Sequence, residues 1–198
     1  MVKLVIGIVG AIGAGKDTAA DYLVKKYGFV KFNTSDVLRA ALREEGKVEF
    51  TREDMQEMSK RLRMEGRDVL TEKTLEKIYS SGEEAALILG IRLVDGIEYL
   101  RNKLRNKFFL LAVEVDQRKR FERKQDSIRS DDQDLQEWNE FKRSDDMEMR
   151  GDTGNSQEVG KVMALADMVI ENDGRLEELY GRLDDLIAKS NELTVNNE

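Results

Sequence analysis

Five short apolar runs alternate with longer stretches of helical periodicity along the chain. The runs have the length of buried strands and lie at residues 4–9, 29–33, 85–91, 108–115 and 167–171. Apolar positions recur at helical spacing over residues 18–26, 36–45, 52–65, 68–79, 95–105, 118–125, 158–166 and 175–189. Strands that alternate with helices predict a parallel sheet with helices on both faces. The pattern therefore predicts an α/β fold built on a five-stranded parallel sheet.

A glycine-rich segment joins the first predicted strand to the first predicted helix. Residues 10–18 read GAIGAGKDT and match the phosphate-binding pattern G-x-x-x-x-G-K-[ST], except that Asp17 stands at the last position. In this context the glycines let backbone N–H groups turn inward around an anion, while the helix N-terminus and Lys16 add positive charge. The motif predicts a nucleoside triphosphate site, whose residues are Gly10, Gly13, Ala14, Gly15, Lys16, Asp17 and Thr18.

The amino-acid composition restricts the binding partners and the metal ligands or general bases that this chain can have. The 40 acidic residues outnumber the 33 basic ones, and a net negative chain is a poor general nucleic-acid binder. Since the chain has no histidine and no cysteine, any metal ligand or general base must be a carboxylate or water. No apolar stretch is long enough to span a bilayer, and no signal-peptide pattern opens the chain. We therefore expect a cytoplasmic protein of one domain over residues 1–198, a monomer or weak homo-oligomer that contacts neither nucleic acid nor membrane.

Residues 118–150 are crowded with charge and lie between the last two predicted strands. Such a run is typical of a solvated helix face. Arginines recur through it, however, and in a phosphotransferase this location suits a mobile lid that excludes water and brings cations onto the transferring phosphate. Both interpretations stay open at this point.

Several short motifs, taken in order and spacing, resemble those of P-loop nucleotide kinases. Within that branch the chain most resembles dephospho-coenzyme A kinase-like and adenylate-kinase-related proteins, and the resemblance covers nearly the whole chain. Besides residues 10–18, the matching pieces are TSDVLR at 34–39, KRLR at 60–63, GIR at 90–92, RFER at 120–123, IRSDD at 128–132, MALAD at 163–167 and IENDG at 170–174. The GKDT variant of the phosphate loop also resembles phage-type deoxynucleoside monophosphate kinases.

The resemblance implies a P-loop nucleoside triphosphate hydrolase fold with ATP and Mg²⁺ as cofactors. It implies a core sheet from residues 1–33, 85–115 and 167–189, a small helical acceptor region at about 36–80 and a lid at about 118–150. The expected activity is transfer of the ATP γ-phosphate to a small-molecule nucleotide-like acceptor. Dephospho-coenzyme A ranks first and a (deoxy)nucleoside monophosphate second. A nucleotide-binding protein with impaired catalysis and a P-loop hydrolase of another role remain as alternatives.

Two residues of the phosphate loop receive specific roles. Lys16 is the expected catalytic cation on the terminal phosphates. Asp17 stands where a hydroxyl usually meets magnesium, and a carboxylate is a hard oxygen ligand that could replace it directly or through water. The alternative is an acid that merely complements the helix dipole.

The acceptor is expected to meet residues after the second and third predicted strands. Asp36 would position or deprotonate an acceptor hydroxyl, and Arg39, three residues on, would hold an acceptor phosphate. The alternative is a helix cap formed by Ser35 or Asp36, with an exposed arginine. Arg63 and Arg92 are further candidates for the acceptor phosphate, as is the neighbouring Arg61, because a planar guanidinium suits bidentate phosphate contact.

The resemblance assigns the remaining site residues to the lid and to the end of the last strand. Arg123 and Arg129 resemble lid arginines that neutralise charge in the transition state. Asn172 and Gly174 resemble the loop that touches the adenine base, although Asn-Asp-Gly is also an ordinary turn sequence.

One position departs from the resemblance. Relatives tend to carry an aspartate before Gly90-Ile91-Arg92, where this chain has Leu89. If that missing carboxylate normally orders magnesium or its water, we expect weak turnover rather than weak nucleotide binding.

Overall fold

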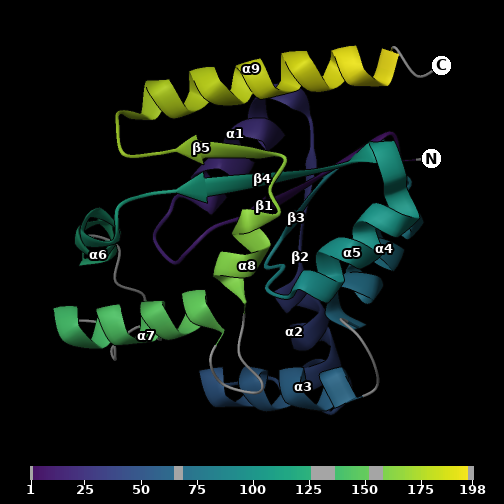
Figure 1. Ribbon diagram of the computed structural model, residues 1–198. Coiled ribbons are helices and arrows are strands. Elements are labelled where there is room, and N and C mark those ends of the chain that lie inside the picture. The colour runs from purple at the N-terminus through teal and green to yellow at the C-terminus, as the bar shows by residue number, and fades with distance from the viewer. Residues whose placement is uncertain (1, 65–68, 126–136, 152–157, 196–198) are drawn as a thin grey trace.

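The computed structural model describes residues 2–64, 69–125, 137–151 and 158–195 (Figure 1). Its centre is a five-stranded sheet in the order β2-β3-β1-β4-β5, in which every pair of neighbours is parallel. The strands are β1 (Leu4–Val9), β2 (Val30–Asn33), β3 (Ala85–Leu89), β4 (Phe108–Glu114) and β5 (Met168–Glu171). The predicted five-stranded parallel sheet is confirmed.

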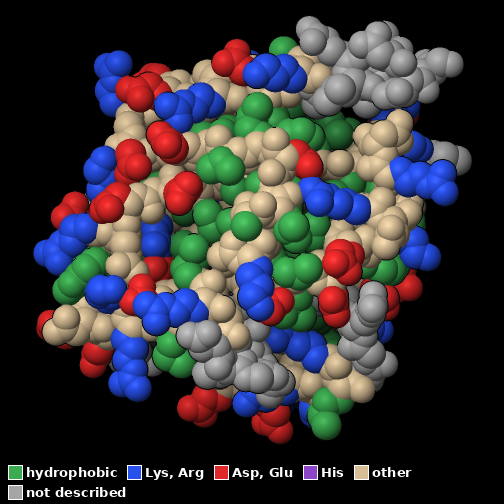
Figure 2. Space-filling model, viewed as in Figure 1, with side chains coloured by type: hydrophobic (Ala, Val, Ile, Leu, Met, Phe, Trp, Pro, Cys, Tyr) green, Lys and Arg blue, Asp and Glu red, His purple; other side chains and the backbone are tan. Residues whose placement is uncertain are grey.

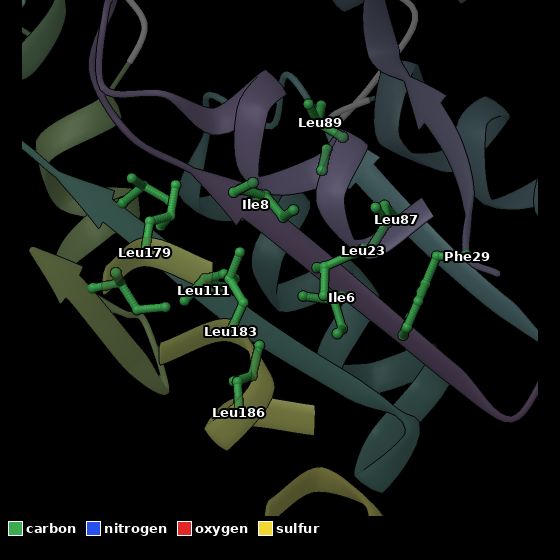
Figure 3. Close-up of a cluster of buried hydrophobic side chains, with 14 of the residues drawn as sticks. Ile6, Ile8, Leu23, Phe29, Leu87, Leu89, Leu111, Leu179, Leu183 and Leu186 are labelled. Atoms are coloured by element: carbon green, nitrogen blue, oxygen red, sulfur yellow. The ribbon is translucent and has the colours of Figure 1, made fainter. Parts of the chain in front are cut away.

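Helices cover both faces of this sheet. On one face lie α1 (Lys16–Tyr27) and α9 (Leu176–Val195), and on the other lie α4 (Val69–Ser81), α5 (Val94–Leu104) and α8 (Val159–Ala164). Side chains along β1 alternate between the two layers: Ile6 and Ile8 pack toward α1 and α9, whereas Val5 and Val9 pack toward α4 and α5. Figure 3 shows the first layer, with Leu23 of α1 and Leu183 of α9 near the strand residues. Burial on both sides explains why the strands read as continuous apolar runs.

Two further groups of helices lie beside the sheet. The helices α2 (Thr34–Glu44) and α3 (Arg52–Met64) pack with α4 around a small core of their own, which includes Val37, Met58 and Leu70. After β4 come α6 (Gln117–Gln125) and α7 (Trp138–Arg150). A short 3₁₀ helix, η1 (Arg105–Lys107), joins α5 to β4.

Two details differ from the sequence-based expectation. The third strand ends at Leu89 rather than at residue 91, because Gly90 turns the chain with φ +84. A Cβ at Gly90 would lie 2.4 Å from Thr34 Oγ1, so only glycine fits this turn. The charged segment also contains a complete helix, α7, which the hydrophobic periodicity did not delineate.

No helix within the described parts of the chain is both long enough and apolar enough to cross a membrane.

Candidate nucleotide-binding site

The glycine-rich loop lies at the carboxyl end of β1 and leads directly into α1. Gly10, Gly13 and Gly15 all have positive φ values, of +154, +77 and +90. A Cβ at Gly10 would lie 2.4 Å from the carbonyl oxygen of Val113, and one at Gly15 would lie 2.5 Å from Nδ2 of Asn172. Both glycines are therefore required by close packing as well as by backbone conformation.

Lys16 is the first residue of α1 and is partly buried inside the loop. Its Nζ donates a hydrogen bond to the carbonyl oxygen of Ala11 at 2.8 Å. Burial, together with the nearby positive charge of Arg92, lowers the pKa of Lys16 to about 8, although Asp17 opposes the shift. An anion that enters the loop would stabilise the charged form of the Lys16 ammonium group, which burial and Arg92 disfavour.

Asp17 and Thr18 occupy the first turn of α1, and both are exposed. Nowhere in the described ranges do three or more Asp, Glu, His or Cys side chains gather into a metal-binding group. Mg²⁺ does not need such a group, because it commonly binds one or two carboxylates and completes its shell with water and substrate phosphate oxygens. The solvent-facing carboxylate of Asp17 beside the loop fits that mode of binding.

A buried ion pair between Arg120 and Asp145 contacts the phosphate loop. The sequence alone assigned no role to either residue. Arg120 of α6 donates from Nη1 to the carbonyl oxygen of Ile12 and from Nε to that of Val115, both at 3.1 Å. Its Nη2 meets Asp145 Oδ2 of α7 at 2.7 Å, and the two side chains are only 6% and 1% exposed. Arg120 lies in the RFER motif beside Arg123, but only its burial distinguishes a supporting residue from a solvated one.

The chain after β5 also packs against the phosphate loop. Asn172 is buried, and its side-chain amide donates to the carbonyl oxygen of Ala14 at 3.0 Å. Arg123 of α6 donates from Nη2 to the carbonyl oxygen of Asn172 at 2.7 Å. Gly174 is exposed two residues further on. The structure thus brings Asn172 and Arg123 to the loop, while Arg129 lies outside the described residues.

The acceptor-side residues follow the neighbouring strand ends. Asn33 caps α2, since its Oδ1 accepts a hydrogen bond from the backbone N–H of Ser35 at 3.1 Å. The alternative interpretation, in which Ser35 or Asp36 forms the cap, is therefore wrong. Asp36 is exposed and forms an ion pair with Arg39 at 2.8 Å, and Arg39 also donates to Ser35 Oγ at 2.7 Å. The Asp36 carboxylate is thus available at the surface of the helix.

Two further arginines lie on different elements. Arg92 follows the turn after β3 and forms an ion pair with Glu148 of α7. Arg63 lies in the last turn of α3 and is half-buried within the helical layer of α2, α3 and α4. Lys and Arg side chains mix with Asp and Glu side chains over α6 and α7 (Figure 2).

Leu89 is a core residue. It is 3% exposed and belongs to the cluster that contains Ile8, Ala14 and Val113 (Figure 3). At the position where the resemblance expects an acid, an apolar side chain therefore packs against the phosphate loop. A carboxylate at this position would be buried.

Comparisons with known proteins agree with this geometry. The model of the family described as AAA domain matches residues 9–141. A UPF0200 protein of Methanothermobacter thermautotrophicus is 31% identical over 190 residues, which cover 96% of this chain and 92% of that protein. Shikimate kinase from Acinetobacter baumannii matches with a TM-score of 0.58 at 16% identity, over 94% of this chain and 93% of that one. A gluconokinase from Sinorhizobium meliloti 1021 matches with a TM-score of 0.56 at 12% identity, over 99% and 98%. The fold is that of P-loop kinases.

Proposed function

The chain belongs to the UPF0200 family and carries an AAA domain with the P-loop kinase fold, and on this premise we propose that it transfers the γ-phosphate of ATP to a nucleotide-like acceptor. One observation carries the proposal. Lys16 follows β1, Arg92 follows β3 and the Asp36–Arg39 pair follows β2, and these three strands are neighbours in the sheet. Donor-side and acceptor-side groups therefore belong to one edge of a parallel sheet, where ligands bind in such folds.

Each group has a role in the proposed reaction. The backbone N–H groups of residues 10–18 and the Lys16 ammonium hold the donor phosphates. Asp17 would bind Mg²⁺, which supplies charge neutralisation of the phosphate oxygens when present. Asp36 accepts the proton of the acceptor hydroxyl, whose oxygen forms the new bond to the γ-phosphorus while the bond to the β–γ bridging oxygen breaks and ADP leaves. Arg39, Arg63 and Arg92 bind the anionic part of the acceptor.

The proposal extends to the lid and to the base site. Residues of about 118–150 form the lid, from which Arg123 and Arg129 neutralise charge as the phosphate transfers. The segment with Asn172 and Gly174 lies against the adenine of ATP, with Asn172 holding the loop at the same time.

We rank a hydroxyl acceptor of the dephospho-coenzyme A type first. The reason is Asp36, a surface carboxylate that neither caps its helix nor is buried, so it can serve as a base. A nucleoside monophosphate kinase is the second candidate, because its acceptor is already an anion and needs arginines more than a base. A nucleotide-binding protein with impaired catalysis is the third, and Leu89 in the core motivates it.

A coupled assay of ADP release tests the proposal. Wild type is incubated with ATP and magnesium against dephospho-coenzyme A and a panel of nucleoside monophosphates. ADP release that depends on an acceptor would support a kinase and identify its substrate class. ATP binding without acceptor-dependent release would overturn the kinase and favour the binding protein.

Asp36→Asn then separates the two acceptor classes. With a hydroxyl acceptor, loss of the base is expected to lower kcat by about 10²- to 10⁴-fold with little change in KM. With a monophosphate acceptor, kcat is expected to change far less. Glu44→Gln, an exposed substitution at the end of the same helix, is the matched control.

A further inference from the structure

Helix α7 carries two carboxylates one turn apart, and each holds an arginine from another element. Asp145 pairs with Arg120 of α6, and Glu148 pairs with Arg92, which follows β3. Both arginines are close enough to the phosphate loop for their charges to lower the pKa of Lys16. Helix α7 therefore forms ion pairs with two arginines that lie near the candidate site.

The two pairs differ in how firmly they are held. Arg120 is only 6% exposed and also donates to the carbonyl oxygens of Ile12 and Val115, so its pairing with Asp145 is part of the fold. The side chains of Arg92 and Glu148 are 43% and 22% exposed. The Arg92–Glu148 pair is therefore partly exposed, and water can replace one partner when the other leaves. Opening a buried pair such as Arg120–Asp145 would instead leave a charge buried without its counter-charge.

Arg92 presents a guanidinium at the edge of the sheet where the acceptor is expected. Its planar donors suit a phosphate or a carboxylate equally well, and a glutamate carboxylate satisfies the same geometry. We propose that Glu148 is an internal stand-in for the anionic group of the acceptor, and that binding requires this group to displace Glu148 from Arg92. The inference rests on the proposed function and narrows its substrate class to acceptors that carry such an anion.

Glu148 is thereby a specificity-determining residue. A neutral acceptor offers no anionic group in exchange for the Glu148 carboxylate, so it is disfavoured at Arg92. An anionic acceptor replaces the Arg92–Glu148 ion pair with an ion pair between Arg92 and the acceptor. The exchange breaks the contact between α7 and Arg92. Removing the carboxylate should strengthen anion binding, which is the reverse of what loss of a merely structural contact would do.

The single tryptophan of the chain reports on the packing of α7 against α6. Trp138 begins α7, and its ring packs against Phe121 with centroids 5.4 Å apart, while Arg118 of α6 lies 4.6 Å from its centroid. Because the buried Arg120–Asp145 pair holds α7 against α6, the fluorescence of Trp138 should stay unchanged when Glu148 leaves Arg92.

The experiment titrates inorganic phosphate into protein whose phosphate loop is filled with magnesium and a non-hydrolysable ATP analogue. Calorimetry measures phosphate binding, and the fluorescence of Trp138 checks that α6 and α7 stay packed in each variant. Glu148→Gln keeps the shape of the side chain and is expected to lower the phosphate dissociation constant about three- to tenfold. Arg92→Gln is expected to abolish the site, and Arg92→Lys to restore part of it. Glu140→Gln, an exposed change on the same helix, should leave the dissociation constant unchanged.

The outcomes separate the two levels of inference. Equal phosphate affinity in wild type and a folded Glu148→Gln variant would overturn the role of Glu148. Phosphate binding that is retained in Arg92→Gln would also overturn it. So would the absence of phosphate binding in wild type and in every variant. Failure of wild type to bind the ATP analogue would instead overturn the proposed function itself. Should Glu148→Gln fold poorly, Glu148→Ala provides the same comparison, with thermal melting as the test of folding.

Discussion

Lys16 combines a full charge with a partly buried position, and this combination changes how it responds to a ligand. In the free protein, burial and Arg92 lower its pKa to about 8, so around that pH a large share of the side chains is neutral. A phosphate group in the loop adds negative charge beside Nζ and raises the pKa again. Ligand binding and proton binding at Lys16 are therefore linked.

From this linkage we predict that nucleotide binding takes up protons. At about pH 8.5, where the phosphates of ATP are fully ionised, a non-hydrolysable analogue should bind with uptake of roughly 0.7 proton per site. At about pH 6 this uptake should vanish, because Lys16 is already protonated. Calorimetry in two buffers of different ionisation enthalpy measures the number, and uptake that persists in Lys16→Met would contradict the assignment.

Arg105 is a second residue with an unusual conformation. It ends α5 with φ 53 and ψ −123, and it is the one non-glycine residue among those described that has a positive φ. Such a conformation is strained for any side chain with a Cβ.

Arg105→Gly should therefore stabilise the protein by about 1 kcal/mol in urea unfolding. The exposed arginine side chain contributes little there. Asn106→Gly, at the next position, whose φ is not positive, should instead cost about 0.5–1 kcal/mol. A loss of stability in Arg105→Gly would show that the backbone at this turn is not under strain.

At the scale of elements, α6 and α7 are joined to the phosphate loop by charge rather than by an apolar interface alone. Arg120 and Asp145 supply the buried pair, and Gln117 donates from Nε2 to Asp145 and Asp146 at 2.7 and 2.9 Å. Phe121, Trp138 and Phe141 add an aromatic cluster between the two helices.

Asp145→Asn should accordingly lower the free energy of unfolding by about 3 kcal/mol, because it leaves the Arg120 charge buried without its counter-charge. The adjacent Asp146→Asn is the matched control. Asp146 meets Lys142 near the surface, so the same substitution should cost less than about 1 kcal/mol. Equal losses in the two variants, measured by urea denaturation, would refute a special contribution from the buried pair.

On the scale of the whole molecule, β1 lies at the centre of the sheet, between β3 and β4. The loop that follows it is contacted by the segments after β4 and after β5, as the hydrogen bonds of Arg120 and Asn172 show. A ligand in this loop would contact elements far apart in sequence, and we expect it to stabilise the entire fold.

An ATP analogue at one hundred times its dissociation constant should add about 2.7 kcal/mol and raise Tm by about 5–10 °C. Gly15→Ala should abolish this shift, since its Cβ would meet Asn172 at 2.5 Å. Gly28→Ala is the control: φ is also positive, at +73, but the added Cβ meets no atom within 4 Å. It should lower Tm in the free protein through strain yet keep the nucleotide-induced rise.

The amino-acid sequence by itself determined the five strands and the phosphate loop. These features depend on local signals: apolar runs such as residues 4–9, and glycines spaced so that Lys16 begins a helix. The other strand ends differ from the prediction by at most one residue, whereas β3 ends two residues early, at Leu89. That end depends on contact between Gly90 and Thr34, more than fifty residues away in the chain.

Only the tertiary structure decided which charges face solvent and which are paired. The sequence marks residues 118–150 as charged, but a charge run does not reveal that Arg120 is buried against Asp145 or that Arg92 meets Glu148. Nor does it reveal that Asn172 supports the loop through Ala14. The physical reason is that ion pairs and hydrogen bonds between distant segments follow from strand order and helix packing, for which local periodicity carries no information.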